Sequence, residues 1–312
     1  MTLRFFSLLV CFLYLLSSNA QKKEDILVPQ IPYDSTANYL GDNVARYTGQ
    51  ELWLKALPQN QRELGYSNFI LNYKKSADLN EEKNIYKCCD GYNSKYEDLA
   101  DKHFFVEQVF KNTQKNKNTG EKEDRIFLKL KELSSGDIVY YYYEGLSEYS
   151  FPFVVIGYLQ KQKSLLIGQQ FVFASEILDY ATDLKTNKAI KPVLGQNWKC
   201  IDVTVDDKNF ELSMIVENQK KQRIAVPLSA YTNKQLPRKI YTAQEGTDMN
   251  KRFGVYNYHR VLQRKIASNM TKEMCKMSWG EPINIVKSGN TEKWIYSQDS
   301  ITFRGNKIIK MN

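Results

Sequence analysis

The sequence has few of the residues and motifs on which common catalytic and metal sites depend. It contains two histidines, His103 and His259, and no cysteine pair spaced C-x-x-C, so neither a zinc ribbon nor a thioredoxin-like redox site is expected. It also lacks the serine elbow G-x-S-x-G and the phosphate loop G-x-x-x-x-G-K-[ST]. Carboxylates are abundant, but no two stand out as the acid and base of a glycosidase. We therefore expect no cofactor, no bound metal and no site of these enzyme classes.

Long apolar runs are scarce, and the one near the N-terminus has the layout of a secretory signal peptide. Arg4 is the only charge within residues 1–20, residues 5–16 are apolar, and small residues precede Gln21. No later segment reaches the roughly eighteen apolar residues of a membrane-spanning helix. Cys11 lies inside the apolar run, which argues against a lipid anchor. We expect an exported chain without a transmembrane segment.

Charge of one sign is not concentrated in any dense patch. The 44 lysines and arginines exceed the 35 acids by nine, and removal of Arg4 with the signal peptide leaves +8 (43 − 35). The strongest basic run, residues 111–125, also carries acids and Gly120, which is typical of a solvated hairpin loop. We therefore expect no nucleic acid partner.

Four cysteines remain after removal of the signal peptide: Cys88, Cys89, Cys200 and Cys275. Export permits disulfides, and four cysteines allow three pairings, between which the sequence does not choose. For the adjacent Cys88 and Cys89, a bond from one of them to another cysteine, or two free thiols, is favoured over a bond to each other.

Residues 37–241 have the pattern of β-structure. Short segments rich in β-branched and aromatic residues alternate with turns rich in glycine, asparagine, aspartate or lysine. In RIFLKLKEL the period of two places Ile126, Leu128 and Leu130 on one face of a half-buried strand. Residues 21–36, which contain two prolines, predict an extended linker.

The β-region contains an internal repeat. Residues 48–57 resemble residues 167–176, residues 101–110 resemble residues 195–204, and two further strand segments follow in the same order. We predict two tandem β-modules, residues 37–155 and 156–241, each of about five strands and the size of a small, partly open barrel of the Src-homology-three kind. In this alignment Cys200 lies opposite Val106, which indicates a buried thiol that behaves as a small hydrophobic side chain.

The character of the sequence changes in the last part of the chain. After a candidate N-cap at Asp248, apolar residues recur at helical spacing: Val255, Tyr258, Leu262 and Ile266. A second, short helix is expected to begin at Thr271 and to end before Gly280 and Pro282. The segments PINIVK, EKWIYS, SITFRG and NKIIKM predict short strands joined by hairpin turns. Residues 242–312 therefore predict an α+β module.

This C-terminal unit resembles the small outer-membrane lipoprotein A family, the OmlA/SmpA group, with the envelope assembly factor BamE. The matching residues are Met270, Thr271, Gly280, Pro282, Trp294, Tyr296, Phe303 and Gly305. The chain departs from the family pattern at Asn269, Met274, Cys275 and Ser278, and it has no lipidated cysteine. The resemblance implies an ααβββ module of the cell envelope without catalytic activity, in which Cys275 occupies a valine position facing the sheet.

The whole chain is also similar to uncharacterised exported proteins of Bacteroidetes bacteria. These combine a signal peptide, tyrosine- and lysine-rich β-modules and segments like EYSFPFVVIGY, which occupies residues 148–158 here. The similarity implies a Gram-negative envelope location and no known activity.

The tyrosine-rich segment VYYYYEGLSEYSFPF, residues 139–153, has the most unusual composition. One interpretation is an aromatic platform on which sugar rings or a peptide stack. The favoured interpretation is two strands with one face in a core and, on the other face, tyrosines whose hydroxyls reach water.

Tandem modules without a catalytic constellation favour a mainly β, non-enzymatic binding or scaffold protein. It would recognise a peptide, a glycan or an envelope protein in the periplasm or on the cell surface of a Gram-negative bacterium. One alternative is a cell-wall hydrolase with Cys200 or Cys275 as nucleophile and His103 or His259 as base. A second alternative, from the C-terminal resemblance, is an accessory of outer-membrane assembly.

Overall fold

The structure, a computed structural model, is mainly β, with curled antiparallel sheets of half-barrel form and a C-terminal unit of helices and strands, as predicted. The predicted signal peptide lies outside the described residues, as do residues 116–119 of the predicted hairpin loop. The described residues are 25–74, 79, 81–115, 120–208, 210–233 and 237–312.

The chain forms two compact units, and the predicted domain boundaries stay predictions. Within the described residues, unit 1 comprises 25–34, 39–54 and 61–152, and unit 2 comprises 35–38, 55–60 and 153–312.

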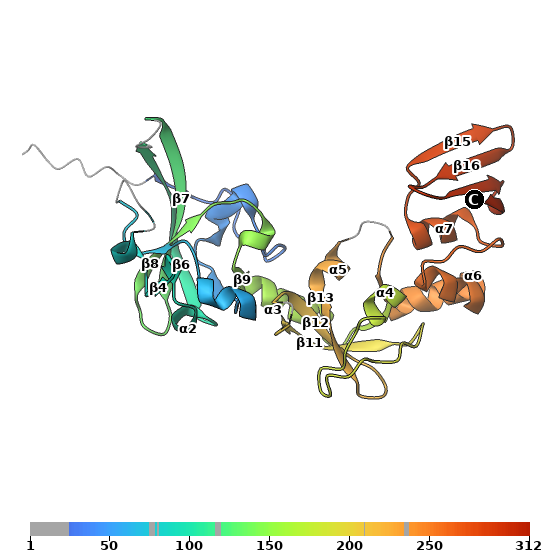
Figure 1. Cartoon of the computed structure of the whole chain (residues 1–312), viewed down its shortest axis with the longest axis horizontal. Helices are drawn as coiled ribbons and strands as arrows, with labels where there is room; N and C mark the ends of the chain where they lie inside the picture. Colours follow the sequence, from blue (N-terminus) through green and yellow to red (C-terminus); the bar gives the residue numbers. More distant parts are fainter. Residues whose placement is uncertain (1–24, 75–78, 80, 116–119, 209, 234–236) are drawn as a thin grey trace, which may run out of the picture. The chain divides into compact units, whose positions relative to one another are not determined.

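Unit 1 is built on a meander of three antiparallel strands, β6 (His103–Lys115), β7 (Lys122–Glu132) and β8 (Ile138–Tyr143). Strand β2 (Glu51–Leu54) pairs with the other edge of β6, and β3 (Phe69–Ile70) pairs with β8. The strands β6, β7 and β8 lie side by side in Figure 1. The two-residue strand β1 (Asp25–Ile26) also pairs with β6. One face of this sheet is fully buried through Leu52, Phe104, Val106, Leu130 and Val139.

Shorter elements connect these strands. The helix α2 (Tyr96–Leu99) follows a hairpin of β4 (Cys88–Asp90) and β5 (Asn93–Ser94). The remaining ones are the 3-10 helices η1 (Gly41–Tyr47), η2 (Gln59–Leu64), η3 (Glu82–Asn84) and η4 (Glu148–Ser150).

Unit 2 contains a second antiparallel sheet, with the strand order β13-β12-β11-β10-β14. The last strand, β14, pairs with the first, β10, and the sheet is curled in half-barrel form. The strands are β10 (Gln170–Phe173), β11 (Trp198–Val205), β12 (Leu212–Glu217), β13 (Arg223–Pro227) and β14 (Ile240–Thr242). Unit 2 also contains β9 (Phe153–Val155) and the helices α3 (Ile156–Leu166), α4 (Ser175–Leu178) and α5 (Leu228–Thr232).

The predicted repeat is confirmed by the pairing register. Below, the first β-module means β2, β6, β7 and β8, and the second means β10 to β14. The predicted alignment matches Leu52 with Phe171 and Phe104 with Trp198, and these residues form the pairs Leu52↔Phe104 and Phe171↔Trp198. A bulge then follows at the same aligned place, directly after Val106 and directly after Cys200.

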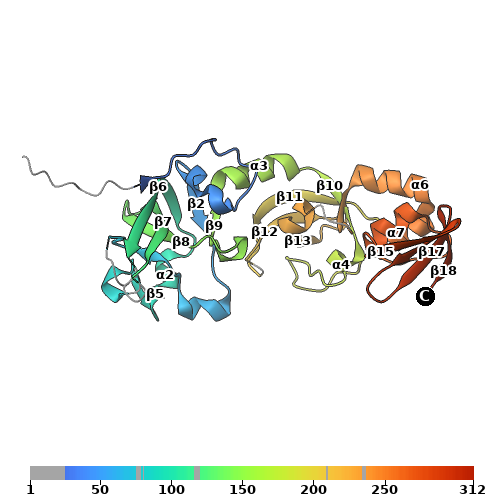
Figure 2. The same ribbon diagram turned by 90° about the horizontal axis from the view of Figure 1, so that it is seen from above.

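The C-terminal part of unit 2 has the predicted order of two helices followed by strands. The helices α6 (Ala243–Leu262) and α7 (Lys272–Trp279) cover one face of the sheet β15-β16-β17-β18 (Figure 2). The strands are β15 (Asn284–Ser288), β16 (Thr291–Ile295), β17 (Ser300–Arg304) and β18 (Lys307–Met311).

The helix ends are partly as predicted. Thr271 caps α7 through Met274 N, and Gly280, with φ +87°, ends it. The predicted N-cap of α6 is wrong: Thr242, not Asp248, caps it, because Thr242 and Glu245 form a reciprocal capping box.

The predicted apolar stripe of α6 is wrong at both ends, since the helix ends at Leu262, before Ile266. Gly254, with φ +74°, interrupts the helix, and Val255 after it is 60% exposed. Within the described residues, no helix has the length and apolar character needed to cross a membrane.

Candidate functional site

The two free thiols lie in hydrophobic cores. Cys200 is fully buried in β11, its Sγ donates to the Asp202 carbonyl at 3.3 Å, and burial raises its pKa to about 11. Cys275 is fully buried in α7, and burial raises its pKa to about 12. Both thiols therefore act as the small hydrophobic side chains predicted, because a nucleophilic cysteine needs a lowered pKa.

Neither histidine is a partner of these thiols. His103 Nδ1 lies 2.7 Å from Glu51 Oε1, and its ring runs parallel to that of Trp53. His259 lies in α6, where its ring is 5.6 Å from the Tyr258 ring. Among the described residues, neither thiol is hydrogen-bonded to a histidine, and no three His, Cys, Asp or Glu side chains group as metal ligands. The arrangement required by the Cys/His hydrolase alternative is missing from this part of the chain.

Cys88 and Cys89 form a disulfide with each other across a cis peptide bond. This corrects the expectation of a bond to another cysteine or of two free thiols. Cys200 and Cys275 are buried as free thiols in hydrophobic cores, so neither is a partner of Cys88 or Cys89.

The tyrosine-rich segment packs on both of its faces. In β8, Tyr141 and Tyr143 point into the main core of unit 1. Tyr140 and Tyr142 point the other way and pack on a second cluster formed by Ile70, Tyr73, Phe110 and Phe127. Of the two strands favoured from the sequence, the first is present as β8 with one face in a core, whereas residues 148–150 form the 3-10 helix η4 and the next strand begins only at Phe153. The opposite face of β8 is half-buried by this cluster rather than open to water.

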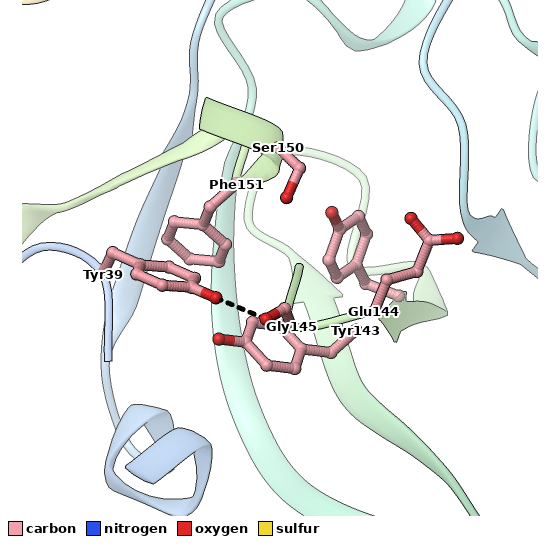
Figure 3. Close-up of a pocket in the computed structure, with 7 residues that line it drawn as sticks. Tyr39, Tyr143, Glu144, Gly145, Ser150 and Phe151 are labelled. Carbon is pink, nitrogen blue, oxygen red and sulfur yellow. Dashed lines mark hydrogen bonds between the residues drawn. The ribbon is translucent and has the colours of Figure 1, made fainter. Parts of the chain in front are cut away.

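A small hollow lies at the end of β8, lined by Tyr39, Tyr141, Tyr143, Glu144, Gly145, Ser150 and Phe151 (Figure 3). Its volume of about 200 Å³, which includes space open to solvent, is below the roughly 300 Å³ of the smallest usual ligand sites. The hydroxyl of Tyr39 donates to the Gly145 carbonyl at 2.8 Å, and that of Tyr143 donates to the Gly41 carbonyl at 3.0 Å. These tyrosines hold loops in place and leave little room for a ligand.

A more open aromatic surface lies on the outer face of β2, β6, β7 and the start of β8, opposite the main core. Its large side chains are Trp53, which is half-buried, and Phe105, Leu133 and Ile138, which are 38%, 47% and 37% exposed. Cross-strand pairing places Glu51, Phe105, Lys131 and Ile138 in one row. Together with His103 these residues form the outer patch, whose members are Glu51, Trp53, His103, Phe105, Lys131, Leu133 and Ile138.

The second β-module has charged residues where the outer patch has apolar ones. The row that corresponds to Glu51, Phe105, Lys131 and Ile138 is Gln170, Lys199, Glu217 and Arg223. Arg223 Nε and Lys221 Nζ each lie 2.9 Å from a carboxylate oxygen of Glu217. The same sheet architecture thus carries Lys199 and Arg223 in one copy and Phe105 and Ile138 at the matching positions in the other.

The position of Trp53 also differs between the modules. Its counterpart Val172 is 2% exposed and belongs to the hydrophobic cluster of α6 and α7. Gly246 of α6 approaches so closely that a Cβ there would meet Val172 Cγ2 at 3.0 Å. In the second module a helix therefore covers this position, whereas the Trp53 ring stays half-exposed.

Sequence reasoning did not identify the outer patch, although the repeat alignment held the signal. The repeat alignment matched Phe105 with Lys199. An aromatic residue in one copy aligned with a charged residue in the other indicates a surface that differs between the copies. Comparisons with known proteins provide no further guide, since no protein-family model, curated protein or solved structure matches the chain. The two family resemblances therefore stay predictions.

Proposed function

We propose that this chain is an exported, non-enzymatic binding protein of the cell envelope. Its outer patch would bind a protein partner through an apolar segment of that partner. The rest of the chain, with the second β-module and the C-terminal module, would act as a scaffold. The signal-peptide layout and the two resemblances support the envelope location.

The single observation that carries the proposal is the difference between the two copies of the repeat. The second module demonstrates that this sheet tolerates Lys199, Glu217 and Arg223 on its outer face. The architecture therefore does not require Phe105 or Ile138 at the matching positions. Clustered exposed apolar side chains that folding does not require indicate an interaction surface.

The composition of the patch favours a protein partner over a glycan. Trp53 and Phe105 supply large, rigid contact areas of the kind that dominate protein interfaces. Leu133 and Ile138 add aliphatic surface, which offers no ring on which a sugar can stack. Glu51 at one end of the row and Lys131 between Phe105 and Ile138 supply both signs of charge for polar contacts with a protein.

The burial of both thiols weighs against the Cys/His hydrolase alternative, because a buried thiol with a raised pKa is a poor nucleophile. A role as an assembly accessory is compatible with the proposal, since such an accessory also binds envelope proteins.

The test gives the first module the surface of the second. The substitutions Phe105→Lys, Lys131→Glu and Ile138→Arg together reproduce the charged row without changing the net charge. We expect the mature chain, residues 21–312, to retain partners from a cell-envelope extract, and we expect the triple variant to lose them. Folding should be unaffected, because each new residue occupies the same backbone position in the second module.

A matched control changes exposed apolar residues of unit 1 outside the patch. Leu146 and Tyr149 are 75% and 94% exposed, and Leu146→Lys with Tyr149→Glu also leaves the net charge unchanged. This control should retain every partner. Equal retention by the triple variant would refute the proposal, and sedimentation with purified peptidoglycan in place of protein capture would assign the patch to a glycan.

A further inference from the structure

The sheet β15–β18 has one face turned to the helices and one turned away from them. Trp294, Ile301, Phe303 and Ile308 are buried on the helix side. Because successive residues of a strand point to opposite faces, Lys293, Thr302 and Arg304 lie on the outer side. All strand neighbours are antiparallel, and the pairing register carries this alternation across the sheet.

Within residues 284–311, which are all described, four cations lie on this outer side and no acid does. Pairing places Lys293, Thr302 and Lys310 in one row, and Arg304 opposite Lys307 in the next. All four cations are exposed, and none has an ion pair within the described part of the chain. We call this surface the cationic face; its members are Lys293, Arg304, Lys307 and Lys310.

Charged residues on the helix side of the same sheet form ion pairs with each other. Lys272 Nζ lies 2.8 Å from Glu292 Oε2, and Lys276 Nζ lies 2.8 Å from Glu281 Oε2. Trp294 Nε1 also donates to Glu292 Oε2, at 3.3 Å. Lys272 and Lys276 thus have acidic partners, whereas no ion pair with the cationic face is found among the described residues.

Folding alone does not account for the cationic face. Arg304 and Lys307 are directly opposite in neighbouring strands, and like charges in that position destabilise a sheet. The arrangement therefore works against the stability of the hairpin that carries it. It is explained if an external anion neutralises these charges.

We propose that the cationic face is a docking site for an acidic segment or surface of a protein partner. This site is separate from the outer patch and does not depend on it. The complementarity is electrostatic, between four cations on a flat sheet and carboxylates of the partner. Exposed pairs of this kind are weakened by salt, so the interaction should fall steeply as ionic strength rises.

The composition of the face favours a protein over a membrane surface. Peripheral membrane binding combines basic residues with aromatic or aliphatic side chains that insert among the lipids. The rows that carry the four cations contain serine and threonine, and their one apolar residue, Val286, lies on the edge strand β15. Ile295 of β16 lies on the same side in the neighbouring row but is half-buried, so Val286 on the edge strand is the one exposed apolar side chain of these rows, and insertion requires more than that.

The experiment measures binding of the mature chain, residues 21–312, to poly-L-glutamate as a function of salt. A variant with Lys293→Gln, Arg304→Gln, Lys307→Gln and Lys310→Gln should bind roughly tenfold or more weakly at low salt and show a smaller salt dependence. Its thermal stability should not fall, because the Arg304–Lys307 repulsion is removed.

The matched control carries the same loss of four charges in the second β-module, at exposed lysines: Lys185→Gln, Lys188→Gln, Lys191→Gln and Lys220→Gln. It should bind poly-L-glutamate nearly as well as the unaltered chain. Equal weakening of both variants would reduce the effect to net charge and overturn the proposal. Binding to phosphatidylcholine vesicles that contain phosphatidylglycerol, with none to poly-L-glutamate, would overturn it in favour of a membrane.

Discussion

Val106 and Cys200 occupy the same position in the two β-modules. The backbone N–H of each donates at 2.9 Å to the carbonyl of a glutamine, Gln50 for Val106 and Gln169 for Cys200. The carbonyl of each accepts at 2.8 Å from a glycine, Gly49 or Gly168, and both side chains are fully buried. Each module should therefore accept, at this position, the side chain that the other module has there.

Replacing Cys200 by valine should leave the protein nearly as stable as before. Hydrophobic replacements of similar volume usually cost less than about 1.5 kcal/mol, and the first module already has valine here. Cys200→Ser should cost more, about 1–3 kcal/mol, because it buries a hydroxyl that was previously a weakly polar thiol. Urea unfolding, monitored by circular dichroism, measures the unfolding free energy of both variants. A valine variant less stable than the serine variant would contradict the equivalence of Val106 and Cys200.

The free thiols should react only after the protein unfolds. Burial raises the pKa of Cys200 to about 11 and that of Cys275 to about 12, so at pH 8 almost no thiolate is present. Titration of residues 21–312 with Ellman's reagent should detect no rapid thiol in the native protein and two in denaturant. Rapid labelling of either residue in the native state would revive the hydrolase alternative.

The matched glycines should be equally sensitive to alanine. Gly49 has φ +81° and Gly168 has φ +91°, and a Cβ at either would meet nothing within 4 Å. The cost of alanine is therefore backbone strain alone, about 1–2 kcal/mol at each position. Unfolding free energies of Gly49→Ala and Gly168→Ala test this, and loss at only one position would show that the modules differ there.

Glu132 should make the first module sensitive to acid. Its carboxylate is fully buried; burial alone would raise its pKa, but hydrogen bonds from Ser134 and Ser135 lower it to about 2 from 4.5. A lowered folded-state pKa stabilises the protein above the unfolded-state value, and that stabilisation is lost as pH falls from about 4.5 to about 2.

The aligned residue of the second module supplies the comparison. Asn218 Oδ1 accepts from Lys220 N at 2.9 Å and from Gln222 N at 3.1 Å, so a neutral amide holds the corresponding turn. Glu132→Gln should therefore be less stable at neutral pH, by about 1.5–3 kcal/mol, and lose the acid-dependent part of the unfolding curve. An unchanged slope between pH 4.5 and pH 2 would show that another group titrates.

The fold could be predicted from the sequence wherever a local pattern determined it. The period of two in β7 predicted that strand, and the repeated segments 167–176 and 195–204 predicted β10 and β11. The pairing register confirmed the alignment of the repeat. The N-cap of α6 was wrong because Asp248 is an equally good capping residue by type, and the choice depends on Glu245 folding back onto Thr242. The identity of one candidate capping residue does not reveal whether a second residue will complete the reciprocal contact.

The candidate surfaces were less accessible to sequence reasoning. The tyrosine-rich segment attracted attention by its composition, but tertiary packing from Ile70 and Tyr73 covers the tyrosines on its second face. The outer patch is made of ordinary residues from strands far apart in the chain, so only their pairing brings them together. The cationic face is similar, because its lysines look evenly dispersed until the register places them on one side of a sheet.

The close approach of Gly246 to Val172 determines how the binding roles of the outer patch and the cationic face can be tested separately. Val172 and Tyr241 share one hydrophobic cluster with Trp294 and Phe303, so removal of the C-terminal module would leave part of that cluster uncovered. A chain cut after β14 would then bind other proteins through this newly exposed hydrophobic surface. The partners that it captured would be artefacts of the truncation. Surface substitutions in the complete chain are the reliable way to divide the binding activities.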